Sequence, residues 1–568
     1  MRTKKSWDLK LRSIRCLNPF PKDIIVSKDA VWPPHQRHLQ IRFDPLTMDR
    51  LHFRNALAMV LRRTLQSRGF MEIETPILFK STPEGAREFL VPCRQKGYAY
   101  ALPQSPQQYK QILMAAGITK YYQFAKCFRD EDHRADRQPE FTQLDFEMAF
   151  ADATDVRRTI EQIIKRIFHM LHYLYIPSVI NDVQHPVWRG YQDVKQIPNY
   201  KAEGARDGYM MPENVPRYQT IGLRFPKMPY NHVMTIFGTD KPDLRIVPPR
   251  VSNITPVDSL VSQDFVKMIT NLENPLVEAC KFRLQGFVSE NSSFIQTFFE
   301  ALSKTPQKLG PDSSPGVFVF DSSKPLQGLS ALGHEGAEKL ASMEDKCWPR
   351  CEDGDIIIIQ ARKNEPFRGG STELGRIRKL VYDSAVASGL LPKDDKFQFL
   401  WVYDFPLFTP NEEGPGQGGA AGFSSTHHPF TAPKTAGDLD LLATDPLKAT
   451  GDHYDLVVNG IEVGGGSRRI HVADVQEYVM RDILKMTDEG VGQFAHLLEA
   501  LRAGCPPHAG FAFGFDRLLA VLCDVPSVRD VIAFPKNNKG VDALVRSPSK
   551  TTEEQQRTYH LLGGGASG

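Results

Sequence analysis

The chain has 568 residues, of which 41% are hydrophobic, enough to bury cores in several domains and too many for an intrinsically disordered chain. Its 70 lysine and arginine residues nearly balance 67 aspartate and glutamate residues, so net charge alone does not indicate a nucleic-acid-binding protein. No apolar stretch approaches the roughly 20 residues that cross a bilayer, and the eight cysteines form no CxxC pair. We therefore expect a soluble protein with reduced thiols and no membrane partner.

The first elements in chain order are an arm, a helix and a strand. Residues 1–35 are basic, contain several prolines and show little periodicity, which indicates an N-terminal arm or linker. Apolar residues then recur at helical spacing from Met48 to Leu65, and Gly69 ends the predicted helix. The segment FMEIETP, 70–76, follows as a predicted strand.

Two strands joined by a polar loop are predicted between residues 128 and 150. Polar and apolar residues alternate in the second strand, with Gln143, Asp145 and Glu147 on one face and Leu144, Phe146 and Met148 on the other. Arg129 and Glu131, two residues apart before the loop, are expected to share one strand face. Such alternation is common in a hairpin with a solvated outer face, but the acids and the arginine also suit a nucleotide site.

The middle of the chain predicts a change of domain. Residues 151–180 are expected to be helical, and 187–222, rich in tyrosine, proline, glycine and charge, to form an insertion loop without assigned chemistry. Residues 247–395 have their own strands, helices and proline-rich joins over about one domain length. The four isoleucines at 356–359 indicate a buried strand there.

A second hairpin is predicted around the dipeptide Asn459-Gly460, which favours a two-residue turn. The turn pairs two positions on each side, Val458 with Ile461 and Val457 with Glu462. Asp455 and Glu462 then share one face, where two carboxylates without a cation would repel each other. Either one of them is protonated, or both face water, or both hold Mg²⁺ together with triphosphate oxygens. The glycines at 464–466 remove side chains just beyond, which lets backbone approach a ligand closely.

Several segments are similar to the class II aminoacyl-tRNA synthetases. Phe128-Arg129-Asp130-Glu131 resembles motif 2 of that family, and the longer string RADRQPEFTQ resembles the aspartyl-tRNA synthetases of the bacterial and organellar type. The helix and strand that end at Pro76 resemble motif 1, which builds a homodimer interface in the family. Residues 510–517, GFAFGFDR, resemble motif 3. The strings FPKMPYNHVMTIFGTDKPDLRI and GLSALGHEGA support the match.

The resemblance implies an α+β fold in which helices flank an antiparallel β-sheet, with an inserted α/β domain that shares its fold with part of an amidotransferase. It divides the chain into an arm or linker remnant (1–35), the first half of a catalytic domain (36–246), the inserted domain (247–395), the second half of the catalytic domain (396–550) and a C-terminal tail (551–568).

The activity implied by the resemblance is ATP-dependent activation of L-aspartate, with Mg²⁺, and transfer of the aspartyl group to the 3′-terminal adenosine of tRNA(Asp). Arg129 is the implied catalytic residue. Residues implied to bind aspartate are Glu84, Gln107, Lys110, Arg129, Asp145, His427 and Arg469. Residues implied to bind ATP are Arg129, Asp130, Glu131, Gln138, Phe141, Glu462, Gly514, Phe515, Asp516 and Arg517. The implied metal ligands are Asp455 and Glu462.

The charges of the substrate agree with these roles. Aspartate carries two carboxylates and an ammonium, so its pocket needs cations at one end and an acid at the other. Lys110 and Arg469 would clamp the side-chain carboxylate, the arginine in a bidentate manner, and Glu84 would meet the ammonium. The adjacent residues His427 and His428 suggest a metal site, but neighbouring side chains project differently and lack partners at ligand spacing. Contacts to aspartate and adenylate are expected instead.

One departure from the resembled family concerns the N-terminus. Bacterial-type aspartyl enzymes begin with a β-barrel that reads the anticodon, and this chain starts where the connecting strand would end. Three explanations stay open: a truncated gene model, a ligase that relies on the acceptor end of tRNA, or a paralogue that forms or binds aspartyl-adenylate without charging tRNA. A sister enzyme for asparagine or lysine is not expected to carry the insertion at 247–395. The basic first residues, and the strings that resemble organellar enzymes, favour the mitochondrial matrix over the cytoplasm as the location of the protein.

Overall fold

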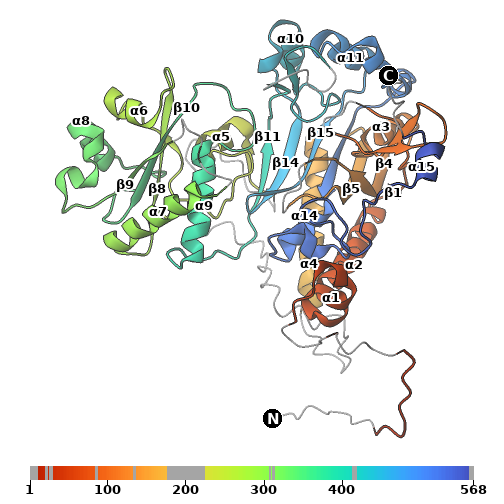
Figure 1. The fold of residues 1–568 in the computed structure, drawn as a ribbon. Coiled ribbons are helices and arrows are strands. Elements are labelled where there is room, and N and C mark those ends of the chain that lie inside the picture. Colours follow the sequence, from red (N-terminus) through yellow and green to blue (C-terminus); the bar gives the residue numbers. More distant parts are fainter. Residues whose placement is uncertain are drawn as a thin grey trace, which may run out of the picture.

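The computed structural model describes residues 10–18, 24, 30–82, 87–131, 136–175, 224–305, 309, 314–411 and 419–561. The fold has two parts, each built around its own main β-sheet (Figure 1). The expected insertion loop at 187–222 and the candidate residue Glu84 lie outside the described residues.

Eight strands form the larger sheet, in the order β1-β4-β5-β16-β15-β14-β11-β6. Their bounds are β1 (Met71–Glu72), β4 (Lys120–Phe128), β5 (Glu140–Ala149), β6 (Lys227–Pro229), β11 (Phe399–Tyr403), β14 (His453–Val458), β15 (Ile461–Arg468) and β16 (His508–Gly514). Neighbours are antiparallel except at the two edges, where β1 runs parallel to β4 and β6 runs parallel to β11. The predicted antiparallel sheet is confirmed.

Three helices supply the core on one face of this sheet (Figure 1): α2 (Pro45–Gln66), α4 (Ala153–Tyr175) and α14 (Phe515–Leu522). Asp44 caps the start of α2 by accepting hydrogen bonds from the N–H groups of Leu46 and Thr47. Gly69 follows the end of the helix with φ +79°, in the left-handed region that favours glycine. The helix predicted from Met48 to Leu65 is confirmed.

Strand β5 sends alternate side chains to two faces of the sheet. Leu144 and Phe146 join the core beneath the helices and are fully buried. Asp145 and Glu147 point to the opposite face, yet only 1% and 0% of their surface is exposed. The interpretation of this hairpin as one with a solvated outer face is therefore wrong, because the second face is covered as well.

A second core packs on the side of the sheet that carries these acids. It includes residues of α3 (Gln107–Ala115), α10 (Ala436–Thr444), α11 (Ala473–Tyr478), α12 (Asp488–Gly492) and α13 (Ala495–Arg502). The other helices of this part are α1 (Arg37–Phe43), α5 (Tyr230–Phe237) and α15 (Glu553–Thr558). Two small antiparallel ribbons complete it, β2 (Leu90–Pro92) with β3 (Ala99–Ala101) and β12 (Phe408–Pro410) with β13 (Phe423–Ser425).

The smaller sheet has the order β7-β8-β10-β9 and is antiparallel throughout. Its strands are β7 (Thr255–Pro256), β8 (Leu276–Phe282), β9 (Gly316–Val319) and β10 (Ile356–Arg362), and its helices are α6 (Gln263–Ile269), α7 (Val288–Ser303), α8 (Gly333–Ser342) and α9 (Glu373–Ala387). The four isoleucines at 356–359 are all fully buried and alternate between two cores, which confirms the predicted buried strand. The domain boundaries at 247 and 395 stay a prediction.

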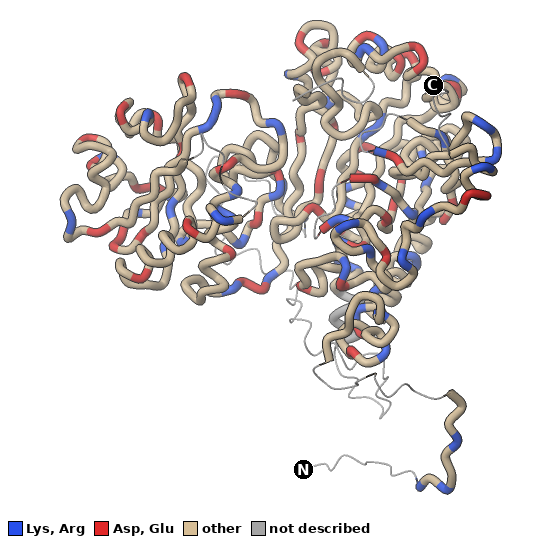
Figure 2. Tube along the Cα trace, in the orientation of Figure 1, with Lys and Arg blue, Asp and Glu red and all other residues tan. Residues whose placement is uncertain are grey.

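The charged residues are mixed along the chain (Figure 2) and the cysteines are unpaired, as the sequence led us to expect. Figure 2 shows basic residues interspersed with acidic ones along both parts of the chain. The eight cysteines are free thiols. Within the described ranges, no helix is both long enough and apolar enough to cross a membrane.

Candidate functional site

A cavity of about 520 Å³ lies over the face of the larger sheet that carries Asp145. Most of the predicted site residues line it: Gln107, Lys110, Arg129, Glu131, Gln138, Phe141, Asp145, His427, Asp455, Glu462, Arg469, Gly514, Asp516 and Arg517. Asp130 and Phe515 do not line it. Residues more than 300 positions apart in the sequence are thus brought together because β5, β14, β15 and β16 are neighbours in the sheet.

Two cations, Lys110 and Arg469, line one buried end of the cavity together with Asp145. Glu147 does not line the cavity but contacts both cations. Lys110 of α3, 2% exposed, places Nζ 3.2 Å from Asp145 Oδ1 and 3.2 Å from Glu147 Oε2. Burial raises the pKa of Asp145, although Lys110 opposes that rise. Burial also acts to raise the pKa of Glu147, but Arg469 and Lys110 outweigh it and hold that pKa below its ordinary value. Glu147 is therefore ionised at neutral pH, and sequence reasoning gave it no role in the site.

Arg469 forms a bidentate ion pair with Glu147, in which Nε lies 3.0 Å from Oε1 and Nη2 lies 3.4 Å from Oε2. Its Nη1 donates to Ser467 Oγ and to His428 Nε2, each at 2.7 Å. Since a guanidinium only donates, His428 Nε2 accepts, and the proton of the neutral ring sits on Nδ1. Burial and the charge of Arg469 lower the pKa of His428 well below its usual range.

These contacts leave each cation one donor for a ligand. Among its described partners, Arg469 commits four of its five N–H groups, and Lys110 commits two of its three. A substrate carboxylate can therefore take one N–H from each cation. The expected bidentate fork from Arg469 differs from this geometry, because Glu147 already occupies the fork.

Arg129 lies at another part of the cavity, directly after the end of β4 at Phe128. The expectation that Arg129 and Glu131 share a strand face is wrong, since both follow the strand. The guanidinium carbon of Arg129 stands 5.3 Å from the centre of the Phe141 ring, a cation–π contact. Its Nε is buried without a hydrogen-bond partner among the described residues. A buried donor of this kind calls for an acceptor from a ligand.

Arg517, at the start of α14, makes weak contacts within the site. Its Nη2 lies 3.3 Å from Asp136 Oδ2, and its Nη1 lies 3.9 Å from Glu462 Oε2. Arg137 pairs with Glu131 at 2.8 Å on the more exposed side. These long or exposed pairs are easily exchanged for contacts to a bound anion.

Other residues expected to bind ATP already have partners within the protein, including Gln138 and Asp516, which line the cavity. The Gln138 amide donates to the Lys536 carbonyl at 3.2 Å and accepts from the Lys536 N–H at 2.8 Å, so it joins two loops. The Phe515 ring is 2% exposed and packs in the core under the helices. Asp516 accepts from the Thr142 N–H at 2.9 Å and pairs with Arg54 at 2.5 Å. Motif membership alone did not reveal which side chains face the cavity.

The hairpin of β14 and β15 places two carboxylates in the cavity. Asn459 (φ 51°) and Gly460 (φ 80°) form the predicted turn, and both predicted pairs beside it are confirmed. Beyond Val457 the register shifts, because Val463 is a bulge residue without a partner on β14. Asp455 therefore pairs with Gly465, whereas regular register would pair it with Gly464.

Asp455 and Glu462 differ in charge state. Burial, followed by the nearby charge of Glu462, raises the pKa of Asp455 to about 8. Burial also acts to raise the pKa of Glu462, but Lys241 and Arg517 bring it below its ordinary value. Two carboxylates in one cavity, where the charge of Glu462 disfavours ionisation of Asp455, form an oxygen donor set that suits Mg²⁺. Lys241 Nζ, 3.7 Å from Glu462 Oε2, offsets part of this negative charge and was not predicted.

The glycines at 464–466 line the cavity as expected, and they also let the strands approach each other. A Cβ on Gly465 would overlap the carboxylate of Asp455, and one on Gly466 would overlap the Gly510 carbonyl. Glycine is therefore required here by the neighbouring strands themselves.

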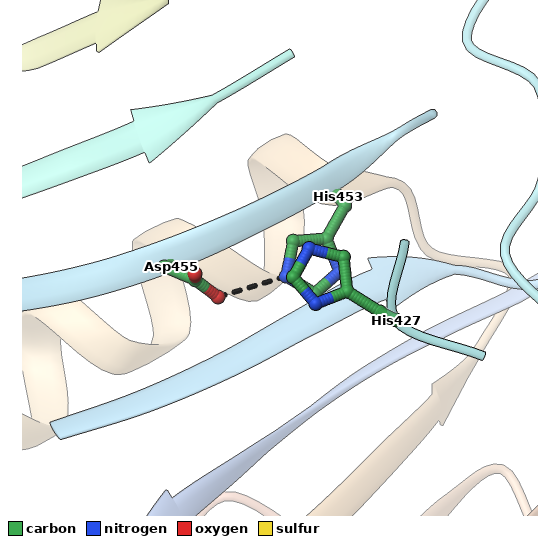
Figure 3. A group of neighbouring side chains, drawn as sticks. All are labelled: His427, His453 and Asp455. Atoms are coloured by element: carbon green, nitrogen blue, oxygen red, sulfur yellow. Dashed lines mark hydrogen bonds and ion pairs between the residues drawn. The ribbon is translucent and has the colours of Figure 1, made fainter. Parts of the chain in front are cut away.

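His427 and His453 lie beside Asp455 and could be taken for a metal site (Figure 3). Their ring centres are 3.4 Å apart and the planes differ by 10°, so the rings are stacked face to face. An imidazole binds a metal through a lone pair in its own plane, and two parallel stacked planes cannot both contain one ion. We interpret the group as a stacked pair, and the expected contact of His427 with aspartate stays a prediction. His453, two positions before Asp455 on the same strand face, was missed although its spacing could have revealed it.

Comparisons with known proteins agree with the resemblance. The family model described as tRNA synthetases class II (D, K and N) matches residues 32–538. The mitochondrial aspartate–tRNA ligase of Schizosaccharomyces pombe is 38% identical over 541 residues, covering 92% of this chain and 75% of the relative. The mitochondrial enzyme of Saccharomyces cerevisiae is 36% identical, covering 98% of this chain and 81% of the relative. The aspartate–tRNA(Asp/Asn) ligase of Opitutus terrae is 35% identical, covering 97% and 82%. With these matches and this sheet, the chain belongs to the class II tRNA synthetases of the D, K and N group.

Proposed function

We propose that the chain activates L-aspartate with ATP and transfers the aspartyl group to the 3′-terminal adenosine of tRNA(Asp). The observation that carries this proposal is the buried Nε of Arg129, which has no partner among the described residues and lies in one cavity with Lys110 and Arg469. Both substrates are anions that such donors bind. The relatives named above are all aspartate–tRNA ligases.

The aspartate side chain binds at the buried end. Its carboxylate takes the free N–H of Lys110 and the free N–H of Arg469, while Gln107, Asp145 and His427 complete the polar lining. Asp145 Oδ2, buried without a described partner, can accept from the substrate ammonium. Glu84 keeps its implied role toward that ammonium as part of the proposal.

ATP binds at the other end. Arg129 contacts the α-phosphate, the Phe141 ring stacks on adenine, and Arg517 exchanges its weak pairs for the γ-phosphate or the second face of the base. Glu131 and Gly514 line the same region. Asp130, Gln138, Phe515 and Asp516 shape this end through their backbone, loop and core contacts.

Mg²⁺ is held by Asp455 and Glu462, whose oxygens fit a hard cation. When bound, it neutralises charge on the triphosphate. Lys241 keeps Glu462 ionised and in place, since it pairs with both Glu462 and Asp240.

The chemistry needs no side-chain nucleophile. The substrate α-carboxylate oxygen attacks the α-phosphorus, the bond from that phosphorus to the bridging oxygen breaks, and pyrophosphate leaves. The 3′-hydroxyl of tRNA then attacks the adenylate carbonyl, loses its proton, and AMP leaves. Catalysis in the first step is positioning plus stabilisation of phosphoryl charge by Arg129.

Location and assembly complete the proposal. The named relatives from yeasts are mitochondrial, so we place this chain in mitochondria, in the matrix. A homodimer forms through α2 and β1, near which Met71, Ile77 and Leu78 expose about half of their surface. The acceptor end of tRNA reaches the cavity from its open side.

The test is aspartate-dependent ATP–pyrophosphate exchange, followed by charging of mitochondrial tRNA with the same preparation. Exchange with aspartate, but not with asparagine or lysine, supports activation, and stable aspartyl-tRNA supports transfer. Exchange without transfer would remove the tRNA step, and absence of exchange would remove the whole proposal.

A further inference from the structure

His453 makes two different contacts inside the cavity. It begins β14 and its side chain is 7% exposed. Its Nε2 lies 2.8 Å from Asp455 Oδ1, and its ring stacks on His427 at 3.4 Å (Figure 3). One side chain thus touches a proposed Mg²⁺ ligand and a proposed aspartate contact.

The surroundings hold both histidine rings in place. The Phe405 ring packs edge-on against His427 and against His453, with ring centres 5.1 Å apart in each case. The hydrogen bond to Asp455 and the stack on His427 use different parts of the His453 side chain, an edge nitrogen and the face of the ring.

We propose that His453 is a positioning residue that orients Asp455 through its hydrogen bond and His427 through its stacked ring. The proposal rests on the proposed function of the cavity. A carboxyl group in a cavity can rotate about its side-chain bonds, and a hydrogen-bonding ring fixed by two aromatic neighbours restricts that rotation before a cation binds. Stacking restricts the His427 ring in the same way before aspartate binds.

The two contacts can be separated by substitution. His453→Phe keeps an aromatic ring against His427 but cannot donate to Asp455. His453→Gln places an amide N–H at about the position of Nε2 but offers no ring to His427. If His453 were merely structural, both variants would lower melting temperature and activity together without distinguishing the two ligands.

The experiment measures two affinities for each full-length variant. Mn²⁺ binding, followed by electron paramagnetic resonance in the presence of a non-hydrolysable ATP analogue, reports on Asp455. Aspartate binding, followed by calorimetry, reports on His427. His496→Phe is the matched control, because His496 lies outside the cavity and its ring nitrogens have no hydrogen-bond partners among the described residues.

We expect His453→Phe to weaken Mn²⁺ binding about tenfold and to change aspartate binding less than about threefold. We expect His453→Gln to do the reverse, with aspartate weakened about threefold to tenfold and Mn²⁺ binding near that of the wild type. Equal effects of both variants on both ligands, or no effect of either, would overturn the proposal. If the wild type binds Mn²⁺ but not aspartate, the proposed function fails while the Mn²⁺ comparison still tests His453. If one variant does not fold, the selectivity of the other decides.

Discussion

Glu147 accepts hydrogen bonds from Arg469 along its bidentate edge, at 3.0 and 3.4 Å, and this pair is fully buried. Lys110 reaches the same carboxylate at 3.2 Å. One acid therefore fixes both cations that we propose bind the substrate carboxylate. Together with Asp145, Ser467 and His428, it leaves each cation a single N–H without a partner among the described residues. The substrate carboxylate is then held at two points with a defined separation, which favours one length of substrate side chain over others.

Replacing Glu147 by glutamine should destabilise the protein, because it leaves two buried cations with one acid. We expect the free energy of unfolding in urea at pH 7 to fall by about 3 kcal/mol. The folded-state pKa of Glu147 lies below its unfolded value of 4.5, so its stabilisation is present above pH 4.5 and is lost as pH falls. The difference between wild type and variant should shrink in acid.

Glu140→Gln is the control for the substitution of Glu147. Glu140 pairs with Lys126 at 3.4 Å at the surface, with 42% of its side chain exposed. The control should change the free energy of unfolding by less than about 0.5 kcal/mol. Equal effects of the two substitutions would show that the buried pairs of Glu147 do not stabilise the fold.

Replacing Arg129 by alanine should remove adenylate formation. The loss of a guanidinium that contacts the α-phosphate should lower the rate of ATP–pyrophosphate exchange about 1000-fold. The rate of Arg129→Lys should lie between those of Arg129→Ala and the wild type, because lysine keeps the charge but lacks the planar guanidinium. Arg557→Ala, on the exposed face of α15, is the control. Near-normal exchange by Arg129→Ala would refute the role.

Much of the fold could be predicted because the patterns are local. Alternation in β5 assigned Leu144 and Asp145 to opposite faces, and Asn459-Gly460 fixed the pairing next to the turn. The bulge at Val463 could not be predicted, since it depends on how β15 fits between two neighbouring strands.

The site was less predictable because its contacts join distant segments. Lys241 meets Glu462 across 221 positions, and no periodicity relates them. The family resemblance supplied most cavity residues, but it also included Phe515, whose side chain faces the core. A motif identifies which strand carries a site, whereas the face of each side chain depends on the position of the strand in the sheet.

The proposed dimer can be tested by placing a charge on its apolar face. Leu78 is 52% exposed beside the strand β1, and Leu78→Asp should prevent two copies from burying this surface. Light scattering after size exclusion should give about twice the 64.1 kDa chain mass for the wild type and the chain mass for the variant. Leu439→Asp, on the exposed side of α10, should leave the dimer intact. A monomeric wild type would exclude this assembly.

Replacing Asp455 by asparagine should stabilise the metal-free protein at high pH and abolish its activity. The folded-state pKa of Asp455 is about 8, above its unfolded value of 3.8, so the folded chain keeps a proton that the unfolded chain has lost. Stability associated with this group is present below pH 3.8 and is lost as pH rises through 8. Without divalent cations, Asp455→Asn should therefore gain melting temperature relative to the wild type between pH 5 and pH 8.5. Asp440→Asn, at an exposed position of α10, should show no such gain, and a lower melting temperature of Asp455→Asn at pH 8.5 would contradict the assignment.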